Sequence, residues 1–436
     1  MKQTEADGET IRTVVERQAE ERRSECFLID PQRDEALSFA ECHSAVLGLA
    51  LHFRNLGVVK GEKVACVASN GRLAVQFILG ALYGGQVAVM LNGAAGSSWL
   101  AAALEHSNAR IVFTDEAHRC EVDKVIRAMA RPPVVIEADS VPRSLGGHQQ
   151  SAVLPLLSAH DDGLLVYTSG STGRPKGVLV SHRSLLAGGW NSVEAHRLSS
   201  RDRSLCVLPL YHMNAQVVTL MSTLLSGGSL VVPERFQANL FWDLVERFRC
   251  TWFALAPAIV SQLVQNAVEG AFGSSRVPES VRFARCSSAP LSPKLHQRFE
   301  ELFRLPLIEA MGSTEAGGAI FSNPLPPAPR KLGSPGLPVG FEVRVVDDAG
   351  VKLPVGQAGE ILVRGPSVMK GYYKEPAATA EILDRNGWLR TGDLGFCDGA
   401  GYFTITGRSK EIIIKGGENV APREIDEVLL AHPSVF

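Results

Sequence analysis

Short apolar runs alternate with longer, periodically apolar segments in the first part of the chain. They predict a strand at Val64–Ala68, a helix at Leu73–Tyr83 and a strand at Val87–Leu91. A helix at Leu100–His106 and a strand at Ile111–Thr114 continue the pattern. Strands that alternate with helices in this way indicate βαβ units, and therefore a mainly parallel sheet with helices on its faces.

A second alternating set follows. Its strands are expected at Leu164–Tyr167, Val178–Val180, Ser204–Leu208, Ser229–Val232 and Trp252–Ala256, and its helices at Val217–Leu225, at Leu240–Phe248 and from His182, with Ser181 as the cap. From Lys331 the pattern changes to short strands, at Glu342–Val346, Gly359–Arg364 and Tyr402–Thr406, after the Pro-rich connector Pro324–Pro329. We expect an α/β fold of two mainly parallel sheets layered with helices, plus a β-rich subdomain at about residues 331–407.

Composition and charge indicate a large cytoplasmic protein. At 436 residues the chain exceeds what one hydrophobic core usually supports, and its net charge of −2 gives no reason to expect nucleic acid as a partner. Its eight cysteines form no CxxC pair, which favours free thiols in a reducing compartment over a structural metal. The N-terminus lacks a signal-peptide pattern, and the longest apolar stretch, Phe77–Leu91, is too short for a membrane span. We expect small-molecule partners and no integral membrane association, and a homodimer stays open.

The segment after Leu164–Tyr167 is the most informative. A loop of hydroxyl and glycine residues with one lysine opens there, and its expected phosphate-binding residues are Thr168, Ser169, Gly170, Ser171, Thr172, Gly173 and Lys176. Glycines let backbone N–H groups approach phosphate oxygens, and the lysine adds a point charge. Because Gly177 follows the lysine, this is not the common P-loop and a metal ligand must come from elsewhere. A flexible surface turn is the alternative, but the apolar strands on both sides favour nucleotide binding.

A carboxylate that could hold the metal occurs at the end of a later apolar strand. The cluster Met311–Glu315 follows Pro306–Ala310, so that a strand ends in a glycine turn with a hydroxyl and a carboxylate at its tip. Glu315 can bind Mg²⁺, and Thr314 can donate to a phosphate oxygen. The same residues could instead cap the N-terminus of a helix.

A candidate ribose site lies further along, in the segment Thr391-Gly392-Asp393. The carboxylate of Asp393 can accept from two vicinal hydroxyls, and Arg408, fifteen residues later, can bind the sugar or a phosphate. Alone, this segment is equally an ordinary turn. The following cluster, Lys410–Asp426, has the pattern of a strand, a glycine turn and a helix, which is also a common structural unit.

Taken in order, these segments resemble the adenylate-forming (AMP-binding) superfamily: acyl- and aryl-CoA synthetases, carrier-loading adenylation domains and luciferases. The motifs that carry the resemblance are the phosphate loop Tyr167–Gly177, the histidine motif Pro209–His212, the adenine-side turn Ser288–Leu291, the metal and phosphate motif Met311–Glu315, the ribose motif Thr391–Asp393, and the hinge Gly407–Arg408 with Lys410. The resemblance extends from about Leu37 to the last residue. Six ordered motifs are far more specific than any one alone.

The resemblance implies that the carboxylate of an acid attacks the α-phosphorus of ATP, that pyrophosphate leaves, and that the acyl group passes to the thiol of CoA. It implies ATP, Mg²⁺ and CoA as cofactors. The implied catalytic residues are Lys176, His212, Thr314 and Glu315, with Glu315 on the metal. Other implied nucleotide contacts are Ser288, Ala289, Pro290, Ala310, Met311, Gly312, Ser313, Asp393 and Arg408; acyl contacts are His212, Met213, Asn214, Val217 and Gly317; CoA contacts are Gly416 and Gly417.

Two departures from the superfamily pattern affect these expectations. Met311 stands where many relatives have an aromatic residue, so stacking near the adenine would be weaker or come from another side chain. The sequence ends at Phe436, before the small C-terminal domain whose late lysine reaches the carboxylate and the α-phosphate in relatives. We expect an N-terminal adenylation domain at 1–407, a hinge with the start of a truncated C-terminal domain at 408–436, and impaired turnover in this span.

The acid and the acyl acceptor stay open. The expected lining of the acyl site is Tyr211, His212, Met213, Asn214, Val217, Ser287, Gly317 and Gly318. Because this set contains no arginine, it favours an aliphatic or aromatic monocarboxylate. A domain that loads a carrier protein and a weakly catalytic adenylate-binding protein are the alternatives to a CoA ligase.

Overall fold

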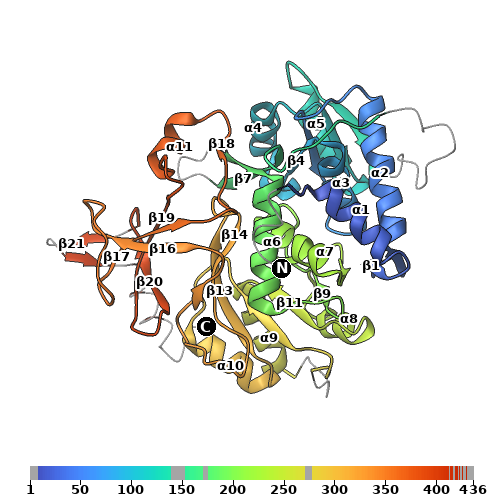
Figure 1. Cartoon of the computed structure of the whole chain (residues 1–436). Helices are drawn as coiled ribbons and strands as arrows, with labels where there is room; N and C mark the ends of the chain where they lie inside the picture. Colours follow the sequence, from blue (N-terminus) through green and yellow to red (C-terminus); the bar gives the residue numbers. More distant parts are fainter. Residues whose placement is uncertain are drawn as a thin grey trace.

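The computed structural model describes residues 8–138, 153–169, 175–270 and 277–411, together with 413–415, 418–420, 422, 425 and 429. In these residues two large, mainly parallel sheets and a smaller antiparallel sheet pack with helices (Figure 1). The predicted α/β architecture with a β-rich part is therefore confirmed, whereas the predicted domain boundaries stay a prediction.

The first sheet has nine strands. Their spatial order is β15 (Leu337–Pro338), β14 (Gly318–Ser322), β13 (Leu307–Ser313), β12 (Phe283–Cys286), β11 (Trp252–Leu255), β9 (Arg203–Leu205), β10 (Ser229–Val231), β1 (Cys26–Asp30) and β2 (Glu35–Ser38). The strands from β13 to β1 in this order are parallel, and β2, β14 and β15 are antiparallel additions. Every residue of β11 and β12 is buried, as expected for parallel strands covered on both faces.

The second sheet has seven strands. Their order is β18 (Gly371–Tyr372), β8 (Pro175–Ser181), β7 (Asp162–Ser169), β4 (Val87–Met90), β3 (Lys63–Val67), β5 (Ile111–Thr114) and β6 (Val134–Glu137). The strands from β7 to β6 are parallel, and β8 and β18 extend the sheet in antiparallel pairing. The edge strand β18 comes from a segment nearly 200 residues later in the chain than β8, so the second sheet is completed by the C-terminal part of the sequence.

The β-rich part is an antiparallel sheet, orange to red in Figure 1, on the side of the molecule away from the first helices. Its strands are β16 (Glu342–Val346), β17 (Gly359–Arg364), β19 (Leu389–Cys397) and β20 (Phe403–Arg408), and a separate pair follows, β21 (Ile413–Lys415) and β22 (Glu418–Val420). Connections through residues 323–336 join this sheet to the first large sheet, because Phe403 N–H donates to Gly336 and Asn323 Nδ2 donates to Ser334.

Helices cover and separate the sheets. They are α1 (Ile11–Glu21), α2 (Phe39–Asn55), α3 (Arg72–Gly84), η1 (Gly93–Ala95), α4 (Ser97–Ser107), α5 (Glu116–Arg127), α6 (His182–His196), η3 (Asn214–Met221), α7 (Ser222–Ser226), α8 (Phe241–Arg247), α9 (Pro257–Val268), α10 (Pro293–Phe303) and α11 (Pro376–Ile382). Helix α6 contacts β7 and β8 of the second sheet and β14 of the first, and most of its residues are buried. Ser181 caps it, as predicted, because its side chain accepts from Ser184 N–H at 3.1 Å.

One expected helix differs in kind. The segment predicted as a helix at Val217–Leu225 begins earlier, as the π-helix η3, and continues as α7. A π-helix is rare, and it is found frequently at functional sites. None of the helices in the described ranges has the length and apolarity of a membrane span. All eight cysteines are free thiols.

Candidate active site

The phosphate loop connects β7 and β8. Thr168 and Lys176 are register partners on this antiparallel pair, and both are half-buried. Ser169 is the last residue of β7. The predicted phosphate-binding residues Gly170, Ser171, Thr172 and Gly173 lie outside the described residues, so their role stays a prediction.

Tyr372 links the two charged residues that were assigned to the phosphates and the metal. Its hydroxyl donates to Glu315 Oε1 at 2.9 Å, and the Lys176 ammonium lies 5.0 Å from the centre of its ring. Partial burial and the Glu315 carboxylate raise the pKa of Tyr372, which therefore stays a neutral donor. The sequence analysis missed this residue, because its place depends on the pairing of Tyr372 with Val178 across β18 and β8.

The metal and phosphate motif lies at the end of β13. Ala310 is buried, Met311 is half-buried and Gly312 is exposed on this strand, which continues through Ser313 before a turn. Residues 314–317 form a turn that leads directly into β14, so the alternative of a helix N-terminus at this point is wrong. Ser313 Oγ accepts from Ala316 N–H at 3.1 Å and holds this turn. Thr314 and Glu315 are half-buried at the turn, where Glu315 C=O accepts from Met369 N–H at 2.8 Å.

Gly317 shapes this turn. Its φ is +72°, and a Cβ on it would lie 2.1 Å from the carbonyl oxygen of Ser367. The next residue, Gly318, adjoins Val217 of η3, since a Cβ there would meet Val217 Cγ1 at 3.4 Å. The turn after β13 therefore packs directly on the predicted acyl-site helix, in a geometry that only glycine adopts without strain.

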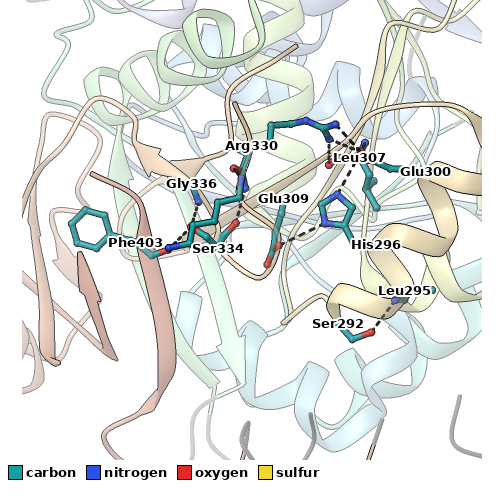
Figure 2. Close-up of polar contacts among 12 residues, drawn as sticks. Ser292, Leu295, His296, Glu300, Leu307, Glu309, Arg330, Ser334, Gly336 and Phe403 are labelled. Carbon is teal, nitrogen blue, oxygen red and sulfur yellow. Dashed lines mark hydrogen bonds and ion pairs between the residues drawn. The ribbon is translucent and has the colours of Figure 1, made fainter. Parts of the chain in front are cut away.

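A buried ionic cluster supports β13 behind the site (Figure 2). His296 of α10 lies between two carboxylates, with Nε2 3.5 Å from Glu300 Oε1 and Nδ1 3.9 Å from Glu309 Oε2. Glu300 also accepts from Arg330 and from Leu307 N–H, the latter at 2.7 Å. Although burial opposes charge on both groups, these partners raise the pKa of His296 and lower that of Glu300 to about 2. The cluster thus fixes the start and the middle of the strand that ends in the metal motif.

The predicted ribose pair is formed by neighbouring strands. Asp393 on β19 and Arg408 on β20 are register partners, and Asp393 Oδ1 accepts from Arg408 Nε at 2.9 Å. Asp393 is only 3% exposed, and its Oδ2 is buried with no hydrogen-bond partner among the described residues. Burial raises the pKa of Asp393, although Arg408 opposes this effect. An acceptor oxygen is therefore left for a hydroxyl donor such as that of a ribose.

The histidine motif leads into η3. His212 is exposed beside the ring of Tyr211, and partial desolvation lowers its pKa. Met213 and Val217 are buried, so they contribute apolar walls. Asn214, the first residue of η3, is half-buried and directs its amide group toward the adenine-side turn after β12.

Asn214 Nδ2 donates to Ser287 Oγ at 2.9 Å and to Ser288 Oγ at 3.1 Å. Ser288 has a φ of +80°, a conformation that costs a non-glycine residue strain and that occurs often at ligand sites. Ala289 and Pro290, which follow it, are exposed. The structure thus brings the predicted acyl-site and adenine-site segments into direct contact.

A buried arginine, Arg285 on β12, also reaches this group. Its Nη1 donates to Ser287 Oγ at 2.7 Å and to Asn214 Oδ1 at 3.2 Å. The expected lining of the acyl site contained no arginine, but Arg285 contacts two of its members. An arginine inside an apolar strand was the signal in the sequence, because such a residue is almost never fully buried without a partner. The predicted CoA contacts Gly416 and Gly417 lie outside the described residues.

Comparisons with known proteins agree with this arrangement. The chain is 42% identical over 414 residues to the sulfoacetate–CoA ligase of Cupriavidus necator, and the matched region covers 94% of this chain and 80% of that protein. It is 37% identical over 276 residues to the oxalate–CoA ligase of Saccharomyces cerevisiae, which covers 63% of this chain and 50% of that protein. The ATP-bound crystal structure of MatB from Rhodopseudomonas palustris matches with a TM-score of 0.85 and 28% identity, covering 98% of this chain and 84% of that one. The AMP-binding enzyme family matches residues 15–373, and the chain therefore belongs to that family.

Proposed function

We propose that this protein is an AMP-forming acid–CoA ligase. It activates a carboxylic acid with ATP, releases pyrophosphate, and transfers the acyl group from the adenylate to the thiol of CoA. The observation that carries the proposal is the contact between Lys176, Tyr372 and Glu315. It is joined by the buried Asp393, whose Oδ2 has no hydrogen-bond partner among the described residues and whose pKa is raised by burial and, to a lesser extent, by the charge of Glu315. The two curated relatives named above are both CoA ligases.

Each charged group has a distinct task in this proposal. Lys176 neutralises charge on the β- and γ-phosphates, and Thr314 donates to a phosphate oxygen. Asp393 Oδ2 accepts from a ribose hydroxyl while Oδ1 stays on Arg408. His212 and Asn214 border the acyl group. Positioning and charge neutralisation account for the first step, because the acid itself is the nucleophile.

Glu315 fits the role of a Mg²⁺ ligand. Carboxylate oxygens suit this hard cation, and only Oε1 of Glu315 is engaged by Tyr372 among the described residues. A bound Mg²⁺ would neutralise the charge of the triphosphate. Glu315 would hold the ion at the turn after β13, and Tyr372 would hold the carboxylate in its orientation.

The test is ATP–pyrophosphate exchange followed by thioester formation with free CoA, using sulfoacetate, oxalate and a panel of aliphatic and aromatic acids. Lys176→Met and Glu315→Gln should each lower exchange by about 10²-fold or more. Lys331→Met is the matched control, since this lysine pairs with Asp398 in the β-rich part. If a folded sample catalyses ATP–pyrophosphate exchange with none of these acids, the proposal is refuted. Thioester formation only on a carrier protein would favour the alternative acceptor. The relatives give no support to impaired turnover, and the kcat of this chain measures it directly.

A further inference from the structure

Arg285 is a buried cation that has no counter-ion within the part of the chain that the structure describes. It is 1% exposed, and its Nε is buried with no hydrogen-bond partner among the described residues. Its partners in these residues, Asn214 and Ser287, are both neutral. Burial lowers the pKa of Arg285 to about 10, so the side chain is still charged at neutral pH. A charge in this position is costly unless an anion joins it.

The carboxylate of the adjacent strand, that of Glu309, lies on the opposite face of the sheet from Arg285. In the parallel pair of β12 and β13, Arg285 is opposite Ile308, and Cys286 is opposite Glu309. Successive side chains of a strand point to opposite faces, so Glu309 and Arg285 are separated by the sheet. By contrast, Arg72, which is 9% exposed, pairs with Glu35 at 2.8 Å, and Arg282 pairs with Asp202 at 2.8 Å. Arg285 therefore differs from these two arginines, since no acidic side chain pairs with it in the described ranges.

The guanidinium contacts Asn214 and Ser287, two of the residues predicted to line the acyl site. Asn214 contacts it through Oδ1 and contacts Ser288 through Nδ2, so two hydrogen bonds of 3.2 and 3.1 Å connect Arg285 to the adenine-side turn. Nη1 is held by Asn214 and Ser287, which leaves the other guanidinium donors for a ligand. Because the single side chain of Asn214 bridges Arg285 and Ser288, a short acid is the kind of ligand that this arrangement favours.

We propose that Arg285 binds a second anionic group, a carboxylate or sulfonate, of a short substrate acid whose other carboxylate is activated. This inference rests on the proposed ligase function and specifies its substrate class. A guanidinium forms charge-assisted hydrogen bonds with planar carboxylates and with sulfonate oxygens. Asn214 is then a positioning residue, because it fixes the guanidinium through Nη1. Sulfoacetate and oxalate, the acids in the names of the two curated relatives, both carry such a second group.

The test compares acids that differ only in the second charge: sulfoacetate against sulfamoylacetate, and oxalate against oxamate. The kcat/KM for ATP–pyrophosphate exchange is measured for the native chain, Arg285→Gln, Arg285→Lys and the control Arg282→Gln. We expect the native chain to prefer the charged acid of at least one pair by about 100-fold. Arg285→Gln should remove about 100-fold in kcat/KM for the charged acid and spare the amide, since truncating one partner of a buried charge pair costs about that much.

Arg285→Lys should keep part of the preference for the charged acid. Arg282→Gln should lower the free energy of unfolding but leave the preference for the charged acid unchanged. A native preference for the amides, or an equal loss for both acids of a pair in Arg285→Gln, would overturn the inference. Exchange with monoanionic acids alone would overturn it and leave the ligase function standing, whereas exchange with no acid would refute both. If Arg285→Gln does not fold, the test uses the ratio of kcat/KM for the charged acid to that for its amide, measured for the native chain and for Arg285→Lys. Ratios near one in both proteins reject the inference. A preference for the charged acid in the native chain that Arg285→Lys partly keeps supports it.

Discussion

The cluster behind β13 makes a strong prediction for His296→Gln. The substitution keeps a polar side chain but removes the cation that lies between Glu300 and Glu309 (Figure 2). Glu300 still has Arg330 and Leu307 N–H, whereas Glu309, 6% exposed, loses the positive charge beside it. Removing one partner of a buried ion pair costs about 3–5 kcal/mol. Because Glu300 keeps two partners, we expect the lower end, about 3 kcal/mol at pH 6.

The loss should depend on pH with a definite sign. The pKa of His296 is raised in the folded protein, so its contribution is complete below the unfolded pKa and is lost as the pH rises through the folded pKa. The pKa of Glu300 is lowered to about 2, so its contribution is present above the unfolded pKa and is lost as the pH falls toward 2. The native chain and His296→Gln should therefore differ more in their free energy of unfolding at pH 6 than at pH 9.

Urea unfolding of both proteins at pH 6 and pH 9, followed by tryptophan fluorescence, measures this difference. His52→Gln is the control, because burial lowers the pKa of this half-buried histidine on α2. The change that His52→Gln causes in the free energy of unfolding should not become smaller as the pH rises. A destabilisation by His296→Gln that is equal at pH 6 and pH 9 would refute the reasoning, since it would mean that His296 acts through packing alone.

Three further outcomes are expected. Tyr372→Phe leaves Glu315 without its donor, and we expect about a tenfold fall in kcat/KM for ATP with little change in the KM of the acid; an unchanged value in exchange assays would argue against this contact. Gly317→Ala should destabilise the protein by about 2 kcal/mol in urea unfolding, since its φ is +72° and a Cβ would meet Ser367; a stability equal to that of the native chain would contradict the geometry. The raised pKa of Asp393 predicts that ATP binding, measured by calorimetry, weakens as the pH falls toward that pKa. Asp393→Asn should bind ATP weakly, and its affinity should not show this dependence on pH.

The alternation of strands and helices from β3 onward followed from the sequence, because apolar period and turn residues are local signals, whereas α1, β1, β2 and α2 were not predicted. The β16 strand at Glu342–Val346 and the β17 strand at Gly359–Arg364 match their predicted ranges. Asp393 and Arg408, which the sequence assigned to one ribose site, do lie side by side, since a short antiparallel connection separates them; their contact with a ribose stays a prediction. These features depend on neighbours in the chain.

Two important residues needed the tertiary structure. Tyr372 reaches Glu315 only because β18 pairs with β8, and no local pattern encodes that pairing. Arg285 contacts Asn214 across more than seventy positions, and the register of β12 and β13 decides which face it occupies. The π-helix at Asn214 was likewise invisible, because its apolar pattern is also that of an α-helix.

The pairing of β18 with β8 has a consequence for how the protein is made. Tyr372 follows Lys176 by 196 positions, so a ribosome that adds about 5–20 residues per second needs roughly 10–40 s between the two. Any sheet that forms during that interval ends at β8 and leaves this edge open to other strands. The late strand both protects this edge and brings the tyrosine to Lys176 and Glu315. A nascent chain thus acquires these contacts of the nucleotide site only when β18 has been made and has paired with β8, which ties the assembly of the site to the closing of that sheet edge.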